Sequence, residues 1–297
     1  MPDDAAVIDD LVVADAGRWV EQFPAEDQDV LLGAVRRWVA TYHWDHERIE
    51  GVLDALLADL RDERVAVAAM QPVGSAQAAL DNLFVRRLRA HGVAMPRTLI
   101  DADVHVYLDD VLCTGRTLDR HLRRLLPRVR PGASVLVFHL VAHTADVRGR
   151  RAALDAYARE LGVELRWDHA LAVENRPETL GGLEVVAPGP WSRSALDPAW
   201  TSRLSAHAFR APDLFGVGPL YADEDERDVV ERALLRAGSR IAARDKRVRP
   251  LGAGENGSLG FGALSWTCFG VPATVPPALW WSDDDWFPLV GDRCDDR

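Results

Sequence analysis

Short apolar segments alternate with amphipathic helical segments between residues 65 and 167, and this alternation limits the possible folds more than any other feature. The expected strands are 65–70, 104–108, 134–141 and 163–167. The expected helices are 76–91, 116–130 and 149–161. Strands that alternate with helices favour a parallel sheet with helices on both faces. The sequence therefore predicts an α/β protein with a doubly wound parallel sheet.

The segments on either side of this core have other patterns. Apolar residues recur at helical spacing over 5–64, which predicts an N-terminal helical cap, and Asp45 can cap one of its helices. After the core, 186–223 is rich in proline, glycine, serine and tryptophan, and 224–245 is a charged amphipathic helix that precedes an irregular aromatic tail. We therefore predict three parts: a cap at 1–64, the α/β core at 65–185 and a C-terminal extension at 186–297.

Composition excludes several classes of protein. The net charge of −11 argues against nucleic-acid binding through a broad basic surface. No segment approaches the ~20 apolar residues that cross a bilayer, and the acidic N-terminus lacks a signal-peptide pattern, so we expect a cytoplasmic protein. Three widely spaced cysteines, Cys113, Cys268 and Cys294, indicate neither a disulfide framework nor a zinc site.

The stretch 104–118 carries most of the functional information. Its apolar run ends in Asp109 and Asp110, so two carboxylates are expected at the carboxyl end of a buried strand. A short loop then leads to the start of a leucine-rich helix through Cys113, Thr114, Gly115, Arg116 and Thr117. Hydroxyls and backbone N–H groups at a helix start form an anion site. A ligand with both a diol and a phosphate would satisfy both halves of the motif.

The alternative for this motif is an acidic loop followed by an ordinary capped helix. Ionised neighbours such as Asp109 and Asp110 repel each other unless a metal ion or ribose hydroxyls compensate. Gly115 gives the backbone the freedom to curl around a phosphate. We therefore favour the ligand-binding interpretation.

The motif resembles the 5-phosphoribosyl-1-pyrophosphate (PRPP) loop of type I phosphoribosyltransferases. That pattern is an acidic pair, two apolar residues, a small residue and Thr-Gly-x-Thr; here Tyr107 replaces an aliphatic residue and Cys113 occupies the small position. The resemblance implies that Asp109 and Asp110 are catalytic, bind the ribose hydroxyls and contact Mg²⁺ indirectly, through those hydroxyls or water. It also implies that residues 113–117 wrap the 5′-phosphate.

A second loop follows the first strand of the core. In the family, the positions of Val73, Gly74 and Ser75 form a pyrophosphate loop with exposed backbone N–H groups. The alternative is a plain strand-to-helix turn in which Ser75 is the N-cap. Many type I enzymes have a basic residue in this loop, whereas this sequence has none, which places catalytic competence in question.

Three further pieces resemble a narrower group, the bacterial phosphoribosyltransferase-like proteins associated with conflict (anti-phage) systems. They are Met70 to Ser75, Val248 to Gly252 together with Leu259 to Gly262, and Pro272 to Trp281. This resemblance covers most of the chain.

Two functions follow from these resemblances. The first is a Mg²⁺-dependent transferase, in the pentosyl-transfer class of glycosyltransferases, that moves phosphoribosyl from PRPP to an unknown nitrogenous acceptor in nucleotide metabolism or antiviral defence. The second is an inactive sensor or regulator that binds PRPP or a nucleotide in the same pocket. The implied partners are that small molecule and a second copy of the chain or a defence-system protein, with no membrane.

Other short motifs have weaker support. The letters Gly-x-Gly-x-x-Gly occur at 252–257, but a charged helix precedes them where a dinucleotide site needs a strand. The pairs His43 and His46, and His139 and His143, lack the third or fourth ligand of a metal site. We therefore interpret these residues as a turn and as core or surface histidines. The tail tryptophans are interpreted as packing groups in preference to base-stacking ones.

Overall fold

The computed structural model describes residues 16–144, 147–175, 184–196, 198–201, 204–205, 208–210, 217–254 and 257–291. The chain divides by its internal contacts into two compact units, 44–173 and the combination of 1–43 with 174–297. The first division falls inside β1 (His43–Trp44). These units do not coincide with the three predicted parts, because α4 (His46–Asp59) packs on α5 (Ala76–Ala90) of the sheet unit.

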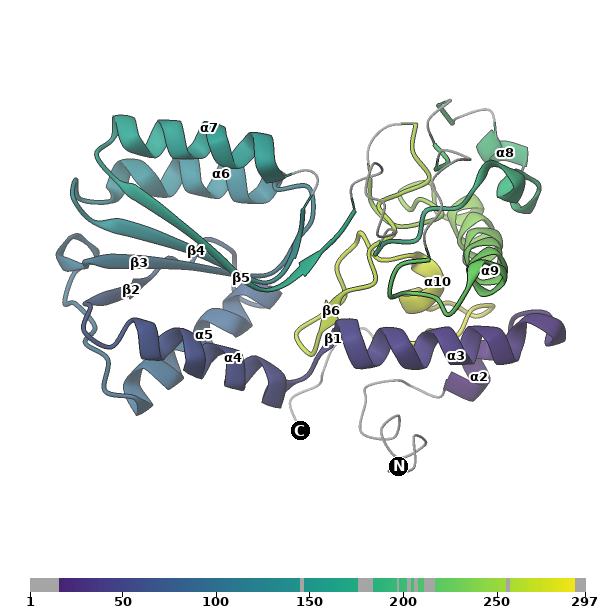
Figure 1. Ribbon diagram of the computed structural model, residues 1–297, viewed down its shortest axis with the longest axis horizontal. Helices are drawn as coiled ribbons and strands as arrows, with labels where there is room; N and C mark the ends of the chain where they lie inside the picture. The colour runs from purple at the N-terminus through teal and green to yellow at the C-terminus, as the bar shows by residue number, and fades with distance from the viewer. Residues whose placement is uncertain are drawn as a thin grey trace. The chain divides into compact units, whose positions relative to one another are not determined.

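Residues 44–173 form an α/β unit around a four-stranded parallel sheet in the order β2-β3-β4-β5. The strands are β2 (Val65–Val67), β3 (Val104–Leu112), β4 (Ser134–His143) and β5 (Glu164–Val173). Helices α4 and α5 cover one face of the sheet, and α6 (Arg116–Leu125) and α7 (Val147–Glu160) cover the other (Figure 1). The predicted α/β fold with a parallel sheet and helices on both faces is confirmed.

All four strands have different lengths from those predicted, and β4 ends two residues later than predicted, at His143. The edge strand β2 ends at Val67, whereas β3 continues to Leu112 and β5 continues to Val173. The longer β3 is explained by pairing, because Val111 and Leu112 are in register with Val141 and Ala142 of β4. The acidic pair therefore lies inside the second half of β3 and not just beyond the strand.

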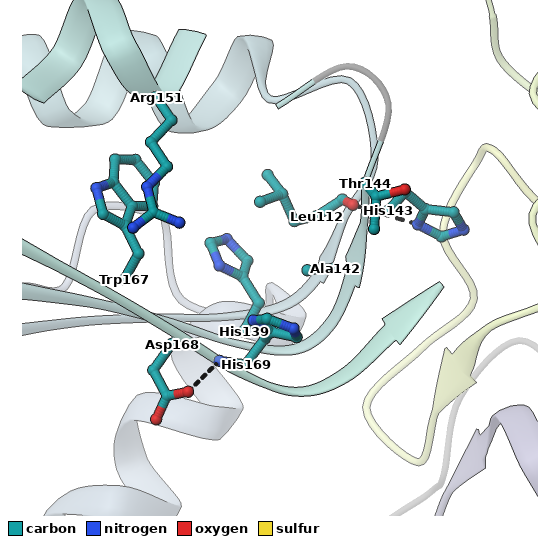
Figure 2. A pocket seen from close by; sticks show the side chains of 9 residues that line it. All are labelled: Leu112, His139, Ala142, His143, Thr144, Arg151, Trp167, Asp168 and His169. Atoms are coloured by element: carbon teal, nitrogen blue, oxygen red, sulfur yellow. Dashed lines mark hydrogen bonds between the residues drawn. The ribbon is translucent and has the colours of Figure 1, made fainter. Parts of the chain in front are cut away.

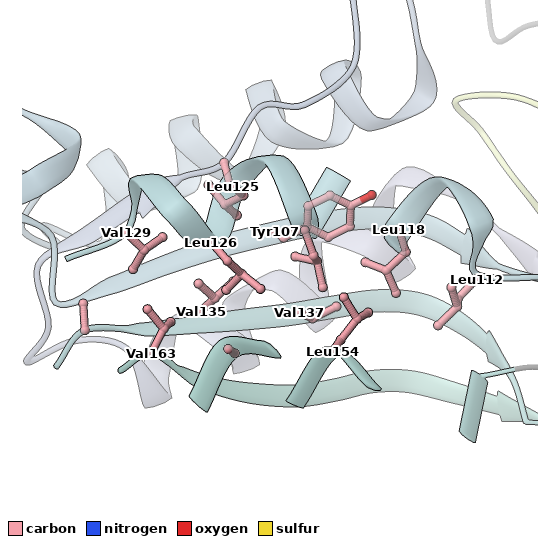
Figure 3. Close-up of a cluster of buried hydrophobic side chains, with 14 residues drawn as sticks. Tyr107, Leu112, Leu118, Leu125, Leu126, Val129, Val135, Val137, Leu154 and Val163 are labelled. Atoms are coloured by element: carbon pink, nitrogen blue, oxygen red, sulfur yellow. The ribbon is translucent and has the colours of Figure 1, made fainter. Parts of the chain in front are cut away.

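A buried apolar cluster fixes α6 and α7 to the sheet (Figure 3). Leu118, Leu122 and Leu125 recur at helical spacing on α6 and are all buried, as the sequence predicts. Full burial of each such leucine contributes about 1.5–3 kcal/mol. The α-helix ends earlier than the predicted residue 130, because Pro127 lies in the following 3₁₀ turn η2 (Leu126–Arg128). A second 3₁₀ turn, η1 (Leu99–Asp101), precedes β3.

The regular elements of the second unit are mostly helices, joined by long irregular segments. Its elements are α2 (Ala16–Val20), α3 (Ala25–Tyr42), η3 (Pro190–Ala195), α8 (Pro198–Thr201), α9 (Glu224–Arg244), β6 (Trp266–Thr267) and α10 (Pro277–Trp280). Helix α9 matches the predicted 224–245, packs on α3, and begins where the Asp223 carboxylate accepts a hydrogen bond from the Glu226 N–H (2.8 Å). Trp266 and Trp286 are buried, which agrees with a packing role.

The predicted N-terminal helices are present within the described residues as α2, α3 and α4, and the part at 5–15 lies outside them. Asp45 caps α4 as predicted, because its carboxylate accepts a hydrogen bond from the Arg48 N–H (2.7 Å). Within the described residues, none of the helices has the length and hydropathy needed to cross a membrane.

Candidate functional site

The acidic pair of β3 forms the centre of the candidate site. Asp109 and Asp110 are half-buried, and Asp109 Oδ2 accepts hydrogen bonds from the Tyr107 hydroxyl (3.2 Å) and from Gln71 Nε2 (3.4 Å). Burial, and next the charge of Asp110, raise the pKa of Asp109 well above its ordinary value. Two adjacent carboxyls of this kind resist being ionised together. A hydroxyl donor or a cation supplied by a ligand would relieve that repulsion.

A buried hydrogen-bond chain fixes Asp109 from the α6 side. The Tyr107 ring is fully buried, and its hydroxyl lies 3.1 Å from His121 Nδ1 of α6. The hydroxyl has one proton, so its donation to Asp109 requires His121 Nδ1–H to donate to Tyr107. Burial lowers the pKa of His121, which favours the neutral imidazole that this chain needs. Asp109 is therefore held in one orientation from inside the protein.

Sequence reasoning missed the three residues that position Asp109. Tyr107 carried a signal, since a tyrosine stands where the family pattern has an aliphatic residue. Gln71 and His121 carried none, because one lies in a turn and the other on an arginine-rich helix. Only the packing of β2, β3 and α6 brings the three together.

The loop after β3 turns directly into α6. Gly115 is the N-cap and has left-handed backbone angles (φ 68°), which a glycine adopts without strain. Among the described residues no side chain caps this helix start, so the backbone N–H groups of its first turn can donate to an anion. Cys113 and Gly115 are buried, Thr114 is half-buried, and Arg116 and Thr117 are exposed. The predicted 5′-phosphate residues are thus contiguous with the acidic pair.

Arg150 of α7 lies over this loop. Its Cδ is 3.1 Å, and its Nε 3.8 Å, from the position that a Cβ on Gly115 would occupy. The side chain therefore adds a positive charge next to the amides of α6. In a chain of net charge −11, such a local cation offsets the repulsion that a phosphorylated ligand would meet.

The loop after β2 has features of the plain turn considered above. The Ser75 hydroxyl caps α5 by accepting a hydrogen bond from the Ala78 N–H (3.1 Å), and Val73 is 99% exposed. Gly74 has a positive φ of 90°, and the space where its Cβ would lie is open. Gln71, at the start of this loop, is the residue that reaches Asp109. Gln71 therefore links the start of this turn to Asp109 of β3, while the pyrophosphate role of Val73, Gly74 and Ser75 stays a prediction.

A hollow of about 190 Å³ lies between α7, the carboxyl half of β4 and the middle of β5 (Figure 2). Leu112, the last residue of β3 before the 113–117 loop, also lines it. Its lining is Leu112, His139, Ala142, His143, Thr144, Arg151, Trp167, Asp168 and His169. Burial lowers the pKa of His139 to about 3 and that of His143 to about 4, so both rings are neutral near pH 7. The Arg151 guanidinium lies 5.4 Å from the centre of the Trp167 ring and is the positively charged side chain of this lining.

The acidic pair could hold a magnesium ion only together with ligand oxygens or water. In the described residues, no group of three or more histidine, cysteine, aspartate or glutamate side chains converges as a metal site. Mg²⁺ commonly binds through one or two carboxylates plus substrate phosphates and water. Asp109 and Asp110 offer two carboxylates of this kind, and the indirect magnesium contact through ribose hydroxyls or water stays a prediction.

Comparison with known proteins identifies one family. The family model PRTase-CE matches residues 16–291, which is nearly the whole chain. We found no matching curated protein and no matching solved structure.

Proposed function

Because the chain belongs to the PRTase-CE family, whose members are phosphoribosyltransferase-like proteins associated with conflict systems, we propose that it binds PRPP with Mg²⁺ and transfers phosphoribosyl to a nitrogenous acceptor. The observation that carries the proposal is the continuity of two half-sites. Asp109 and Asp110 at the end of β3 are followed, within one loop, by the uncapped start of α6 at Gly115. PRPP carries both groups that these half-sites would bind, the ribosyl hydroxyls and a 5′-phosphate, in one molecule.

Each half-site has a defined task in this proposal. The carboxylates of Asp109 and Asp110 accept hydrogen bonds from the 2′- and 3′-hydroxyls. The amides of the first turn of α6 and the guanidinium of Arg150 bind the 5′-phosphate. The Tyr107 hydroxyl and the Gln71 amide hold Asp109 in place before the ligand arrives. Such preorganisation spares the ligand the cost of ordering the carboxylate.

The transfer itself needs little side-chain chemistry. The bond between C1 of the ribose and the pyrophosphate oxygen breaks, and pyrophosphate leaves with the electron pair. The acceptor nitrogen forms the new C1–N bond and loses its proton to water. Mg²⁺, when bound, supplies positive charge to the leaving pyrophosphate. The residues of this chain contribute by fixing the ribose and by excluding other orientations of C1.

One observation favours the alternative, a sensor or regulator that binds PRPP or a nucleotide without transfer. The loop proposed to bind pyrophosphate has no basic residue, whereas Arg150 lies by Gly115 in the loop proposed to bind the 5′-phosphate. In this alternative, a cation helps to bind the 5′-phosphate, but no basic side chain of the 73–75 loop stabilises a leaving pyrophosphate.

Calorimetry with PRPP and Mg²⁺ tests the binding that both functions share. We expect saturable binding by the wild-type chain and at least tenfold weaker binding by the double variant Asp109→Asn/Asp110→Asn. Asp62→Asn, which removes an exposed carboxylate before β2, is the matched control and should bind normally. Equal affinity of the wild type and the double variant would refute the proposed site.

A second assay separates the enzyme from the sensor. Pyrophosphate release is measured with PRPP, Mg²⁺ and a panel of purine and pyrimidine bases and nucleosides. Release that depends on one acceptor and disappears in Asp109→Asn/Asp110→Asn supports transfer. PRPP binding without release across the panel supports the sensor.

We extend the proposal to a role in bacterial anti-phage defence in the cytoplasm, with a second copy of the chain or a defence protein as partner. The conflict-system association of the family supports this extension. Phage challenge of cells that express the wild-type chain within its gene neighbourhood tests it. Protection that Asp109→Asn/Asp110→Asn abolishes would support the role, and equal plaque numbers with and without the wild-type gene would contradict it.

A further inference from the structure

A second hollow, of about 340 Å³, lies along the edge strand β2. Its lining comes from β2, from the middle of α5 and from the segment before β3: Val65, Ala66, Val67, Ala69, Asp81, Asn82, Val85, Met95, Pro96, Arg97 and Thr98. None of these residues belongs to the acidic pair, the 113–117 loop or the 73–75 turn. The hollow is therefore separate from the site described above.

Asp81 is the unusual member of this lining. Asp81 is only 5% exposed. Neither of its carboxyl oxygens has a hydrogen-bond partner in the part of the chain that the structure describes. Buried carboxylates without partners are rare in folded proteins because burial removes their hydration at a cost in free energy. The burial also raises the pKa of Asp81 to about 7. A donor that enters the hollow would repay this cost.

The two unsatisfied oxygens define the donor. A buried carboxylate whose two oxygens lack partners pairs best with a planar group that presents two parallel N–H bonds. Among the other lining residues, Val65, Val85 and the 41% exposed Met95 are apolar and suit the body that carries such a group, while Asn82, Arg97 and Thr98 are polar. We propose that the hollow beside β2 binds a ligand through a planar N–C–N edge that pairs with Asp81, while its apolar body lies against Val85 and Met95.

This chemistry has two sources, a cationic amidinium or guanidinium and the neutral edge of a guanine base. Calorimetry or ligand-observed NMR with the full chain distinguishes them. The probes are benzamidine, which has the cationic edge on an apolar ring, and guanosine, which has the neutral edge. Benzamide, with the same ring but a carbonyl in place of one nitrogen, is the control ligand.

Three variants make the test specific to the carboxylate and the hollow. Asp81→Asn keeps the shape of the side chain but replaces one acceptor oxygen with an NH₂ donor. Val85→Phe keeps Asp81 and fills the hollow. Arg86→Ala alters an exposed residue on the same helix that is outside this lining, and it is the matched control.

We expect benzamidine or guanosine to bind the wild type and Arg86→Ala equally, and to bind Asp81→Asn and Val85→Phe at least tenfold more weakly. Benzamide should bind none of them measurably. Preference for benzamidine identifies a cationic ligand, and preference for guanosine identifies a base; either result supports the site. Failure of both probes to bind, or binding that Asp81→Asn leaves unchanged, overturns the proposal. PRPP binding is unaffected by that failure, because the hollow shares no residue with the PRPP site.

Discussion

Arg150 lies against Gly115: its Cδ is 3.1 Å from the position that a Cβ on this glycine would take. Gly115 also has the left-handed backbone angle that turns the chain from β3 into α6. The glycine therefore serves two purposes at once, since it permits the turn and leaves room for a cation above the helix start. This relationship joins α7 to a loop that the sequence motif describes without it.

The substitution Gly115→Ala should reduce the affinity for PRPP as well as the stability of the folded chain. An alanine with left-handed angles costs about 1–2 kcal/mol, and its Cβ would also displace Arg150 from the loop. Gly92→Ala is the matched control, because Gly92 has the same φ of 68° but open space around its Cβ position. Urea unfolding should show similar losses of stability for both variants. Only Gly115→Ala should bind PRPP at least tenfold more weakly, and equal binding by the two would contradict this account.

Arg150→Gln should reduce the affinity for phosphorylated ligands. Loss of a charge-assisted hydrogen bond to phosphate costs about 1.5–3 kcal/mol, which is roughly a tenfold to hundredfold change in Kd. Calorimetry with PRPP and with ribose 5-phosphate measures it, and both ligands should lose affinity because both have the 5′-phosphate. Arg159→Gln, on the exposed end of the same helix, should bind normally. An unchanged Kd for Arg150→Gln would show that Arg150 does not reach the ligand.

Tyr107→Phe should move the pH dependence of binding to higher pH. The pKa of Asp109 is already raised by burial and by Asp110, and the Tyr107 hydroxyl opposes this rise by donating to the ionised carboxylate. Without that donor the pKa rises further, so the ionised form that binds the ribose is populated only at higher pH. The Kd for PRPP between pH 5 and 9 measures the change. Tyr157→Phe, in the same apolar cluster, should leave the profile unchanged.

Much of the fold could be predicted because local pattern and tertiary packing agree. Apolar runs and leucine spacing indicate β3, β4, α5 and α6, since their buried faces repeat with the period of the element. The lengths of the strands were harder to predict from the sequence. The continuation of β3 to Leu112 depends on its register with β4, and β2 pairs with β3 only as far as Val67.

The candidate site was predictable only where its residues are contiguous in sequence. Asp109, Asp110 and Gly115 belong to one motif, and the structure places them in one strand, loop and helix start. Gln71 and Arg150 come from other elements and reach the site through tertiary packing alone. A sequence pattern cannot show which arginine of an arginine-rich chain lies over a given loop.

Asp81 should make the stability of the wild type fall as pH rises. Its pKa is 3.8 in a model peptide and about 7 in the folded chain, so between these values the folded state keeps a proton that the unfolded state releases. This contribution is fully present below about pH 4 and is lost as pH rises through 7. Asp81→Asn lacks the effect and should be more stable than the wild type at pH 8, by roughly 4 kcal/mol at most.

Urea unfolding of both proteins at pH 4, 6 and 8 measures this difference. The stabilities should lie closest at pH 4 and furthest apart at pH 8. A difference that does not change with pH would show that Asp81 has the same pKa in the folded and unfolded chains.

The central claim is that the turn from β3 into α6 holds a sugar phosphate, and a crystal structure of the chain soaked with PRPP and Mg²⁺ tests it most directly. We predict that the 5′-phosphate oxygens accept hydrogen bonds from the backbone N–H groups of residues 114–117, with the Arg150 guanidinium in contact and the ribose hydroxyls on Asp109 and Asp110. Electron density for the ligand at another place in the chain, with residues 109–117 unchanged and uncontacted, would contradict the account.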